Sequence, residues 1–404
     1  MNLYRLELKR VCKTRMTAIL LAIALVLAVV MAYLPVTFIG WTELDASGNE
    51  VRYTGLKAIR KRQEQQVSGT ITPDVMQEAL EAYQRVYRQH DASSINDIPV
   101  EVFYKELARY QPLVNNAKEA FADSKTGMAP GVMGLTAEDM QNFYSQLPKR
   151  LKSVIWLEQS GKPGYEQAQA IAQKKFDAVQ KPFTYSFGVS SDAMDYQTLL
   201  SLLLTLLCAV IAAPVFASDA QTGAQDIQLC TKNGGLRLAA AKLAAAFSIT
   251  GAAYLLCGVV WILVTNALFG WESTKTSVQW LFSVTSLLPY TVGQMEWVML
   301  VANFLIFFAE VAFVLMASVW AKNNLTALSV ALISVVAPLI VYMVVPGSFG
   351  EWLSTLIPAG GIGLSNALLY KMIGFDFLYA GGHAFFQADV LLASAPIKIV
   401  LLVG

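Results

Sequence analysis

The sequence predicts an all-α polytopic membrane protein with six transmembrane helices, re-entrant or interfacial outer helices, and a mostly helical extracytoplasmic domain between spans 1 and 2. An uncharged apolar run extends from Thr17 to Ile39, a long polar stretch follows it, and apolar segments fill the second half of the chain. The long runs reach the ~18–20 residues that a helix needs to cross the bilayer core. Hydrophobic residues make up 55% of the chain and charged residues only 15%, against about 25% charged in soluble domains.

Charged residues are concentrated in one region of the chain. Most of the 30 basic and 29 acidic residues lie between Glu43 and Asp195, and the net charge is +1. The inserted domain is therefore hydrophilic but nearly neutral, and the remainder of the chain is poor in charge. A nucleic-acid-binding surface needs a basic run or patch, which the sequence lacks, so this class of function is excluded.

The amino-terminal segment predicts the orientation of the chain. Residues 1–15 alternate apolar and basic side chains at helical spacing, which predicts a cytoplasmic interfacial helix, although a solvated tail fits so short a segment equally well. Residues 16–40 form the first predicted transmembrane helix, because their apolar run is too long for a cleavable signal peptide. Since basic residues precede this helix, the positive-inside rule places the amino terminus in the cytoplasm and residues 41–196 outside.

The domain at 41–196 shows helix signals. Thr72 precedes Pro73 as an N-cap precedes the first position of a helix, and Thr136 with Asp139 resembles a capping box. Apolar side chains then recur every three or four residues, which is typical of a helix face packed on a core. The domain is therefore expected to be a helical unit with its own core.

Cysteine and histidine patterns exclude several site types. None of the 4 cysteines lies in the inserted domain, which excludes a disulfide framework there, and no CxxC pair predicts a metal site. No nucleophile, base and orienting group occur at recognisable spacing, so the chain is not expected to be an enzyme or to bind a cofactor itself. The 4 cysteines are Cys12, Cys208, Cys230 and Cys257, and the 2 histidines are His90 and His383.

Residues 197–404 are predicted to form the transmembrane domain. The last predicted span is short and contains Lys398, so we expect the natural chain to extend beyond Gly404. Two uncharged stretches, 276–295 and 352–370, are interpreted as re-entrant or interfacial outer helices, because irregular backbone at membrane depth needs shielding. Counting either as a full span is an alternative that would change the topology. The spans are expected at about 198–217, 243–269, 297–321, 325–346 and 390–404.

Glu310 is an acid inside the fourth predicted span. A charged side chain at mid-membrane costs ~2.5–3.5 kcal/mol on insertion scales, so Glu310 should face protein or a wet cavity. A substrate or proton role is one interpretation. A structural hydrogen bond to Asn303, Ser318 or a partner chain is the other, and it is preferred because no second membrane acid or base is evident for a relay. A Glu310→Gln variant is then expected to keep the fold.

The stretch 218–242 between the second and third spans is the most specific part of the sequence. With six spans it is cytoplasmic. A turn is predicted at 222–223, a short apolar helix at 224–230, and a second turn from Asn233 to Gly235. A short amphipathic helix in this position is suited to fill a groove on another protein, whereas an ordinary loop with a positive-inside flank is the alternative.

This stretch resembles the first cytoplasmic loop of ABC-2-type transporter permeases. The resemblance rests on Phe216, Asp219 and Gly223 in the order Phe-x-x-acid-x-x-x-Gly, on the apolar helix that follows, and on Arg237 and Lys242 before the next span. The acid is usually Glu in that family, and the turn often holds Ser-Pro or Thr-Pro where this chain has Thr-Lys-Asn. The whole layout also resembles the family: a basic start, one span, a large outer insertion and five further spans.

The resemblance implies a permease subunit of an ATP-driven ABC exporter in the cell (plasma) membrane. It would move a lipid-like, peptide or drug-like substrate outward by alternating access. The sequence has no Walker A motif, GxxxxGK[ST], so ATP and Mg²⁺ would bind to a separate ABC ATPase subunit. The other implied partners are a second permease, as a homodimer or heterodimer, membrane lipid and an extracellular accessory protein.

The implied ATPase-coupling residues lie in the cytoplasmic loop and its flanks, and they are Asp219, Thr222, Gly223, Ile227, Leu229 and Arg237. The alternative function is a polytopic receptor or a secretion-machine scaffold that uses the outer domain to bind a partner without ATP coupling. Co-purification of an ATPase separates the two.

Overall fold

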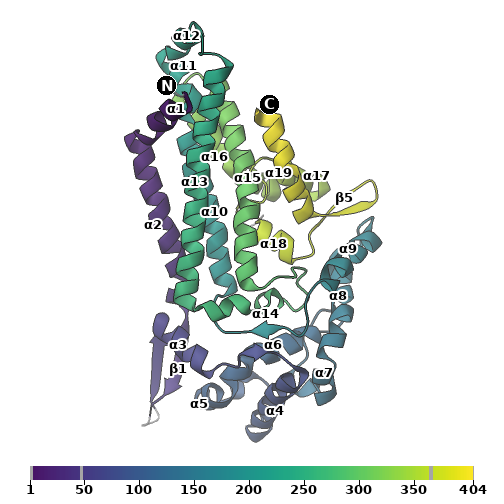
Figure 1. Cartoon of the computed structure of the whole chain (residues 1–404). Helices are drawn as coiled ribbons and strands as arrows, with labels where there is room; N and C mark the ends of the chain where they lie inside the picture. The colour runs from purple at the N-terminus through teal and green to yellow at the C-terminus, as the bar shows by residue number, and fades with distance from the viewer. Residues whose placement is uncertain (1–2, 46–48, 364–366, 404) are drawn as a thin grey trace.

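Long helices stand side by side in a bundle, and residues 40–190 form a domain at one end of it (Figure 1). The computed structural model describes residues 3–45, 49–363 and 367–403. The remaining positions of the predicted segments 1–15, 41–196, 352–370 and 390–404 lie outside the described residues. We call the two ends of the bundle the domain end and the α12 end, after the short helix α12 (Ala224–Leu229) that stands at the latter.

Five helical segments of the bundle are long and apolar enough to cross a membrane by length and composition. The prediction of an all-α multi-pass membrane protein is confirmed at this level. The segments are α2 (Arg15–Phe38), α10 (Ser191–Ala212) continued by α11 (Pro214–Thr222), α13 (Leu236–Phe269), α15 (Val292–Trp320) and α16 (Asn324–Val344).

The sixth predicted span, 390–404, corresponds to α19 (Gln387–Val403), which has 17 residues and packs along α15. This length is at the lower limit for a span, so the six-span topology stays a prediction. At the other terminus, α1 (Leu3–Cys12) packs against α13 at the α12 end.

Two helices begin earlier than predicted, and local capping explains the first of them. In α15, Thr291 and Gln294 form a capping box, so the helix starts at Val292 and not at Trp297. This earlier start brings Glu296 into the bundle. Similarly, α13 has 34 residues and starts at Leu236, so it extends past the predicted boundary toward α12.

The join between α10 and α11 is fixed by one serine of α15. The α-helical pattern is interrupted at Pro214, which has no backbone N–H. Ser318 Oγ donates to Ala213 O at 2.6 Å and accepts from the backbone N–H groups of Phe216 and Ala217, both at 3.1 Å. A hydroxyl has one donor and two acceptor positions, so all of them are used here. The buried Ser318 therefore couples α11 to α15.

The inserted domain is mainly helical, as predicted, and its predicted caps are confirmed. Thr72 Oγ1 accepts from Val75 N at 3.4 Å at the start of α4, and Thr136 with Asp139 forms the capping box of α7. Its α-helices are α3 (Leu56–Gln65), α4 (Pro73–Gln89), α5 (Val100–Val102), α6 (Gln111–Ala120), α7 (Ala137–Gln141), α8 (Phe143–Gln159) and α9 (Tyr165–Asp177).

Short antiparallel strand pairs were not predicted. In the domain, β1 (Gly40–Leu44) pairs with β2 (Glu50–Thr54), and β3 (Gly69–Thr70) pairs with β4 (Thr184–Tyr185). A third pair, β5 (Phe377–Ala380) and β6 (His383–Phe386), precedes α19.

The segment 276–295 connects the inserted domain to the helical bundle. It holds the four-residue helix α14 (Val278–Leu281) and extended backbone before α15, so it is neither a span nor one interfacial helix. Ser277 N donates to Thr184 O at 2.9 Å, and Glu119 of α6 accepts hydrogen bonds from Ser283 Oγ at 2.5 Å and Val284 N at 3.4 Å. The domain is thus hydrogen-bonded to the bundle through the segment 276–295.

The second ambiguous stretch, 352–370, is also interrupted. The helix α17 (Gly347–Leu356) ends before Pro358, and α18 (Leu368–Ile373) follows. Among the described residues, this stretch is therefore not one continuous helix.

The Ser318 contact predicts a measurable cost. A Ser318→Ala variant removes the hydrogen-bond partner of three backbone groups. Each group that finds no new partner should lower the free energy of unfolding by about 1–3 kcal/mol. Thermal unfolding of the purified protein measures it. Ser394→Ala is the control, because the Ser394 hydroxyl bonds only within its own helix, to Leu391 O at 3.0 Å. Equal stabilities of the two variants would contradict the role given to Ser318.

Candidate functional site

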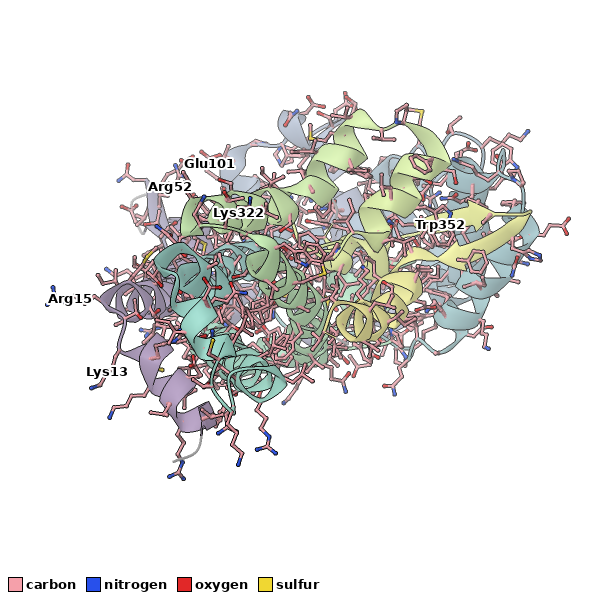
Figure 2. The ribbon with its side chains drawn as sticks, turned by 90° about the horizontal axis from the view of Figure 1, so that it is seen from above. Lys13, Arg15, Arg52, Glu101, Lys322 and Trp352 are labelled. Carbon is pink, nitrogen blue, oxygen red and sulfur yellow. The ribbon has the colours of Figure 1, made fainter. Side chains whose placement is uncertain are left out.

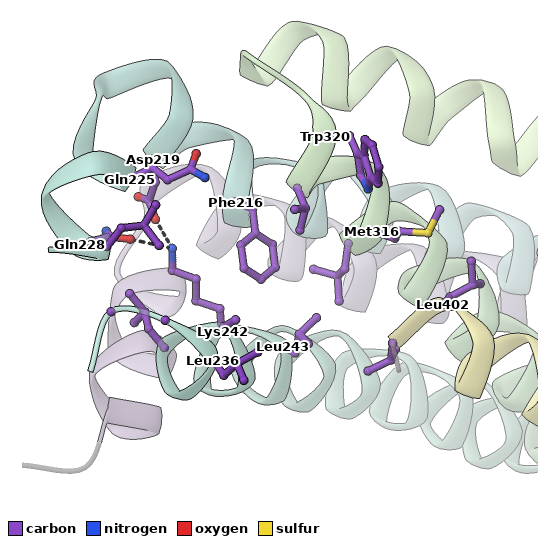
Figure 3. A pocket seen from close by; sticks show the side chains of 18 residues that line it. Phe216, Asp219, Gln225, Gln228, Leu236, Lys242, Leu243, Met316, Trp320 and Leu402 are labelled. Atoms are coloured by element: carbon purple, nitrogen blue, oxygen red, sulfur yellow. Dashed lines mark hydrogen bonds and ion pairs between the residues drawn. The ribbon is translucent and has the colours of Figure 1, made fainter. Parts of the chain in front are cut away.

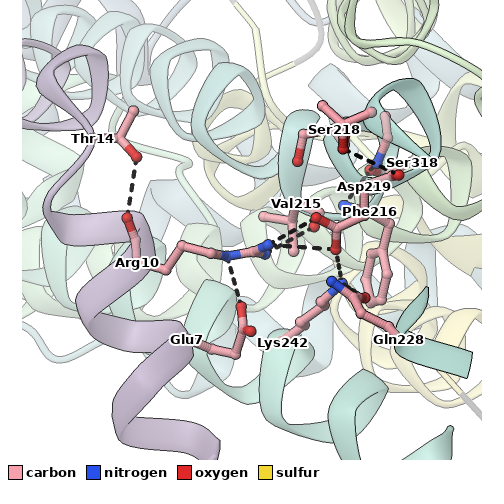
Figure 4. Close-up of polar contacts among 12 residues, drawn as sticks. Glu7, Arg10, Thr14, Val215, Phe216, Ser218, Asp219, Gln228, Lys242 and Ser318 are labelled. Atoms are coloured by element: carbon pink, nitrogen blue, oxygen red, sulfur yellow. Dashed lines mark hydrogen bonds and ion pairs between the residues drawn. The ribbon is translucent and has the colours of Figure 1, made fainter. Parts of the chain in front are cut away.

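A buried ion cluster joins four helices at the α12 end (Figure 4). Asp219 of α11 is 8% exposed, and its Oδ1 lies 3.1 Å from Arg10 Nη1 of α1. Its Oδ2 is paired with Lys242 of α13, whose Nζ also donates to Gln228 Oε1 of α12 at 3.2 Å. Arg10 Nε in turn lies 2.9 Å from Glu7 Oε2. We call these five residues the Asp219 cluster.

The cluster balances two cations against two carboxylates. Lys242 is 4% exposed, and its Nζ lies 5.2 Å from the centre of the Phe216 ring. Buried charges are tolerated only when they are paired and hydrogen-bonded. Arg10, whose side chain is only half-buried, adds a hydrogen bond from Nη2 to Val215 O at 3.2 Å. The arrangement therefore holds α1, α11, α12 and α13 in one fixed geometry.

The helix α12 is presented outward from this cluster. Gly223, with φ of 73°, ends α11 and starts α12, because the left-handed region favours glycine at a sharp turn. Ile227 is 73% exposed and Leu229 is 61% exposed, although both are apolar. Leu236, at the start of α13, is 90% exposed. Exposed apolar side chains gathered at one end are typical of an interaction surface.

The predicted coupling residues divide into two groups. Asp219 is buried in the cluster, and Thr222 and Gly223 shape the turn, with Thr222 Oγ1 donating to Ser218 O at 2.9 Å. Ile227, Leu229 and Arg237 are exposed, and Arg237 bonds only Asn233 Oδ1, at 3.3 Å, among the hydrogen bonds of the described residues. Sequence reasoning missed Arg10 as a partner of Asp219 and Glu7 as a second partner of Arg10, and the basic spacing of the amino-terminal helix was the available signal. It had identified Lys242 only as a flanking charge.

A cavity of about 520 Å³ lies beside the cluster (Figure 3). Its polar end is formed by Asp219, Gln228 and Lys242, and the opposite end by Met316 and Trp320. Most of its lining is apolar. A space with this size and polarity suits an amphipathic group.

Glu310 is fully buried and accepts a hydrogen bond from Ser334 of α16. The predicted partners Asn303 and Ser318 do not bond it; Ser318 serves the α10–α11 join instead. Lys398 of α19 interacts with Glu310 electrostatically and donates to Thr355 O and Ile357 O, each at 3.0 Å. Glu310 therefore has both a hydrogen-bond donor and a basic side chain near it.

A second buried acid of the bundle was missed by the sequence analysis. Glu296 is 0% exposed and lies in the first turns of α15, which the predicted boundary at Trp297 excluded. The statement that no second membrane acid is present was therefore wrong.

Basic side chains gather at the α12 end. Figure 2 views the molecule from this end, and Lys13 and Arg15 point away from the bundle there. Both are exposed, as are Lys232, Arg237 and Lys322 on neighbouring segments. This distribution is what the positive-inside rule uses to orient a membrane protein.

The fold and these sites define a multi-pass helical membrane protein with a large inserted domain. No protein-family model, curated protein or solved structure matches the chain. Within the described residues, no group of three or more His, Cys, Asp or Glu side chains is arranged to hold a metal ion.

The Asp219 cluster predicts a large effect of removing its central charge. An Asp219→Ala variant leaves Lys242 buried without a counter-charge, so we expect a stability loss of about 3–5 kcal/mol. The double variant Asp219→Ala, Lys242→Met should recover part of it, because the orphan charge is removed. Thermal unfolding in detergent measures both.

The exposed pair Glu272–Lys275, with Nζ and Oε2 2.7 Å apart, is the matched control for this experiment. Glu272→Ala should cost no more than about 1 kcal/mol, because water screens exposed pairs. A cost for Asp219→Ala that is no larger than this would show that the cluster does not hold the α12 end together.

Glu119 predicts a pH dependence at the junction of domain and bundle. Burial raises the pKa of Glu119 above its ordinary value, while its hydrogen bonds from Ser283 and Val284 partly oppose the shift. Because the pKa of Glu119 is higher in the folded than in the unfolded protein, protonated Glu119 favours the folded state at acid pH. This contribution to stability is lost as the pH rises through the pKa of the folded protein. Glu119→Gln keeps the acceptor without the charge. Its melting temperature relative to wild type should therefore rise between acid and neutral pH.

Glu101→Gln, an exposed acid of the same domain (Figure 2), is the control and should show a flat difference. The pH trends of other carboxyl groups cancel in each difference from wild type. A flat difference for Glu119→Gln would contradict the burial argument.

Proposed function

We propose that this chain is the membrane subunit of an ATP-driven exporter and that a separate ATPase subunit binds it at α12. The observation that carries the proposal is the combination of exposure and rigidity at α12. Ile227 and Leu229 lie open on a short helix, while Gln228 of the same helix is tied into the Asp219 cluster. A helix that binds an ATPase and transmits its movement needs both an accessible apolar surface and a close connection to the transmembrane helices.

The distribution of charge supports the orientation that this function needs. An ATPase works in the cytoplasm, so α12 must lie on that side. The basic residues at the α12 end, among them Lys13 and Arg15, favour this orientation, and the inserted domain at the opposite end would then lie outside.

The contacts suggest how a push on α12 would travel. Closure of the ATPase on ATP would displace α12, and Gln228 and Lys242 would carry the displacement to Asp219 and so to α11 and α1. Ser318 links α11 to α15 across the break after α10. Rocking of these helices against a second permease copy would expose the substrate path alternately to the two sides. The substrate would be lipid-like, peptide or drug-like, and ATP with Mg²⁺ would bind only to the partner.

The proposal predicts a selective loss of ATPase binding. An Ile227→Asp variant places a charge at the centre of the proposed contact, so the affinity should fall at least about tenfold, which corresponds to ~1.4 kcal/mol. The test purifies the tagged full-length chain from its own host, identifies the co-purified proteins by mass spectrometry and measures ATP hydrolysis of the complex.

Met128→Asp is the matched control, because Met128 is 72% exposed, like Ile227, but lies in the inserted domain. It should retain the ATPase. If wild type purifies with no protein that carries a Walker A motif and shows no ATP hydrolysis, the exporter proposal fails and the receptor or scaffold alternative gains.

A further inference from the structure

Glu296 is held by amide groups from two other helices. Asn266 Nδ2 of α13 donates to Glu296 Oε2 at 2.7 Å, and Gln197 Nε2 of α10 donates to the Glu296 backbone oxygen at 3.0 Å. Glu296 and Asn266 are 0% exposed, and Gln197 is 8% exposed. Three long helices of the bundle therefore meet at the buried Glu296, where Asn266 binds the carboxyl group and Gln197 binds the backbone oxygen.

The unpartnered atoms at this meeting point are oxygens. Glu296 Oε1, Asn266 Oδ1 and Gln197 Oε1 are buried and have no hydrogen-bond partner among the described residues. A buried acceptor without a donor costs about 1–3 kcal/mol, and several together are rare in native cores. What such oxygens need is a positive partner.

None of the described basic side chains forms an ion pair with Glu296. Glu310 differs, because it has Ser334 and Lys398. The charged groups on elements around Glu296 are exposed or engaged elsewhere. They are Asp192 (exposed), Asp195 (with Tyr370), the pairs Glu272–Lys275, Lys371–Asp376 and Lys175–Asp389, and Lys398 (near Glu310).

Polar groups continue from Gln197 along the same face of α10. A cavity of about 20 Å³, lined by Gln197, Ser201, Tyr254 and Asn303 among others, has room for about one water molecule. Ser201 is hydrogen-bonded to Tyr254 of α13, and Thr205 Oγ1, one turn further, donates to Ser201 O at 2.7 Å. Gln197 lines this cavity but Glu296 and Asn266 do not, so the cavity offers a water-sized space beside Gln197, one of the residues that meet at Glu296.

We propose that Glu296, Asn266 and Gln197 form a buried site for one small monovalent cation, supplied either as a proton or as Na⁺. Carboxylate and amide oxygens are hard ligands that suit such a cation. An intramembrane acid needs a neutralising partner, and the described residues do not supply a basic one at Glu296. The proposal is independent of the ATPase contact at α12, because none of its residues belongs to the Asp219 cluster.

The test compares wild type, Glu296→Gln and Glu310→Gln as full-length protein in nanodiscs. Thermal stability is measured from mildly acidic to alkaline pH, in NaCl and in choline chloride. Infrared spectroscopy reports the C=O stretch of protonated carboxyl groups. Glu310→Gln removes a second glutamate that is 0% exposed and so allows the band to be assigned between Glu296 and Glu310.

If the cation is a proton, raising the pH lowers the melting temperature of wild type more than that of Glu296→Gln, because Glu119 titrates in both, and Na⁺ has no effect. The infrared band is then lost in Glu296→Gln and kept in Glu310→Gln. If it is Na⁺, NaCl raises the melting temperature of wild type and of Glu310→Gln but not of Glu296→Gln.

Identical responses of wild type and Glu296→Gln to pH and to Na⁺ would overturn the proposal. If Glu296→Gln does not accumulate, Glu310→Gln alone decides, because Glu296 is then the fully buried glutamate that remains of the pair Glu296 and Glu310. A Glu310→Gln protein with neither a pH-dependent protonated band nor saturable Na⁺ stabilisation would equally overturn it.

Discussion

Neutralisation of Asp219 is the constraint on which the α12 end of the molecule depends. This carboxylate lies between Arg10 and Lys242. Loss of either ion pair would leave a charge of the cluster without its partner. The pairing brings the amino-terminal helix onto the start of the long helix α13. It also fixes the short helix α12, whose apolar side chains Ile227 and Leu229 are exposed.

Several buried polar side chains of the bundle join different helices. Ser318 joins α15 to the break between α10 and α11, and Ser334 joins α16 to Glu310. Asn266 and Gln197 do the same at Glu296. Because lipid supplies no hydrogen bonds, such contacts select one arrangement of otherwise interchangeable apolar helices. A displacement of α12 therefore has defined paths into the bundle.

The sequence predicted what local patterns determine. Long apolar runs located the main helices, Thr72 and Thr136 located helix starts, and the turn at Gly223 located α12. It did not predict contacts between remote residues: Arg10 and Asp219 are 209 residues apart. Glu296 was missed because the capping box at Thr291 extends α15 beyond its apolar run. The strand pairs were missed because strands as short as β3 carry no readable alternation.

Side-specific labelling of Cys230 tests the central claim, that the Asp219 cluster presents α12 to the cytoplasm. Cys230 directly follows α12 and is exposed, and Cys12→Ser removes the other exposed cysteine of the chain's 4. A membrane-impermeant maleimide should label Cys230 in inside-out vesicles and not in intact cells. Labelling from the outside of intact cells would contradict the orientation and, with it, the assignment of α12 as the contact for an ATPase.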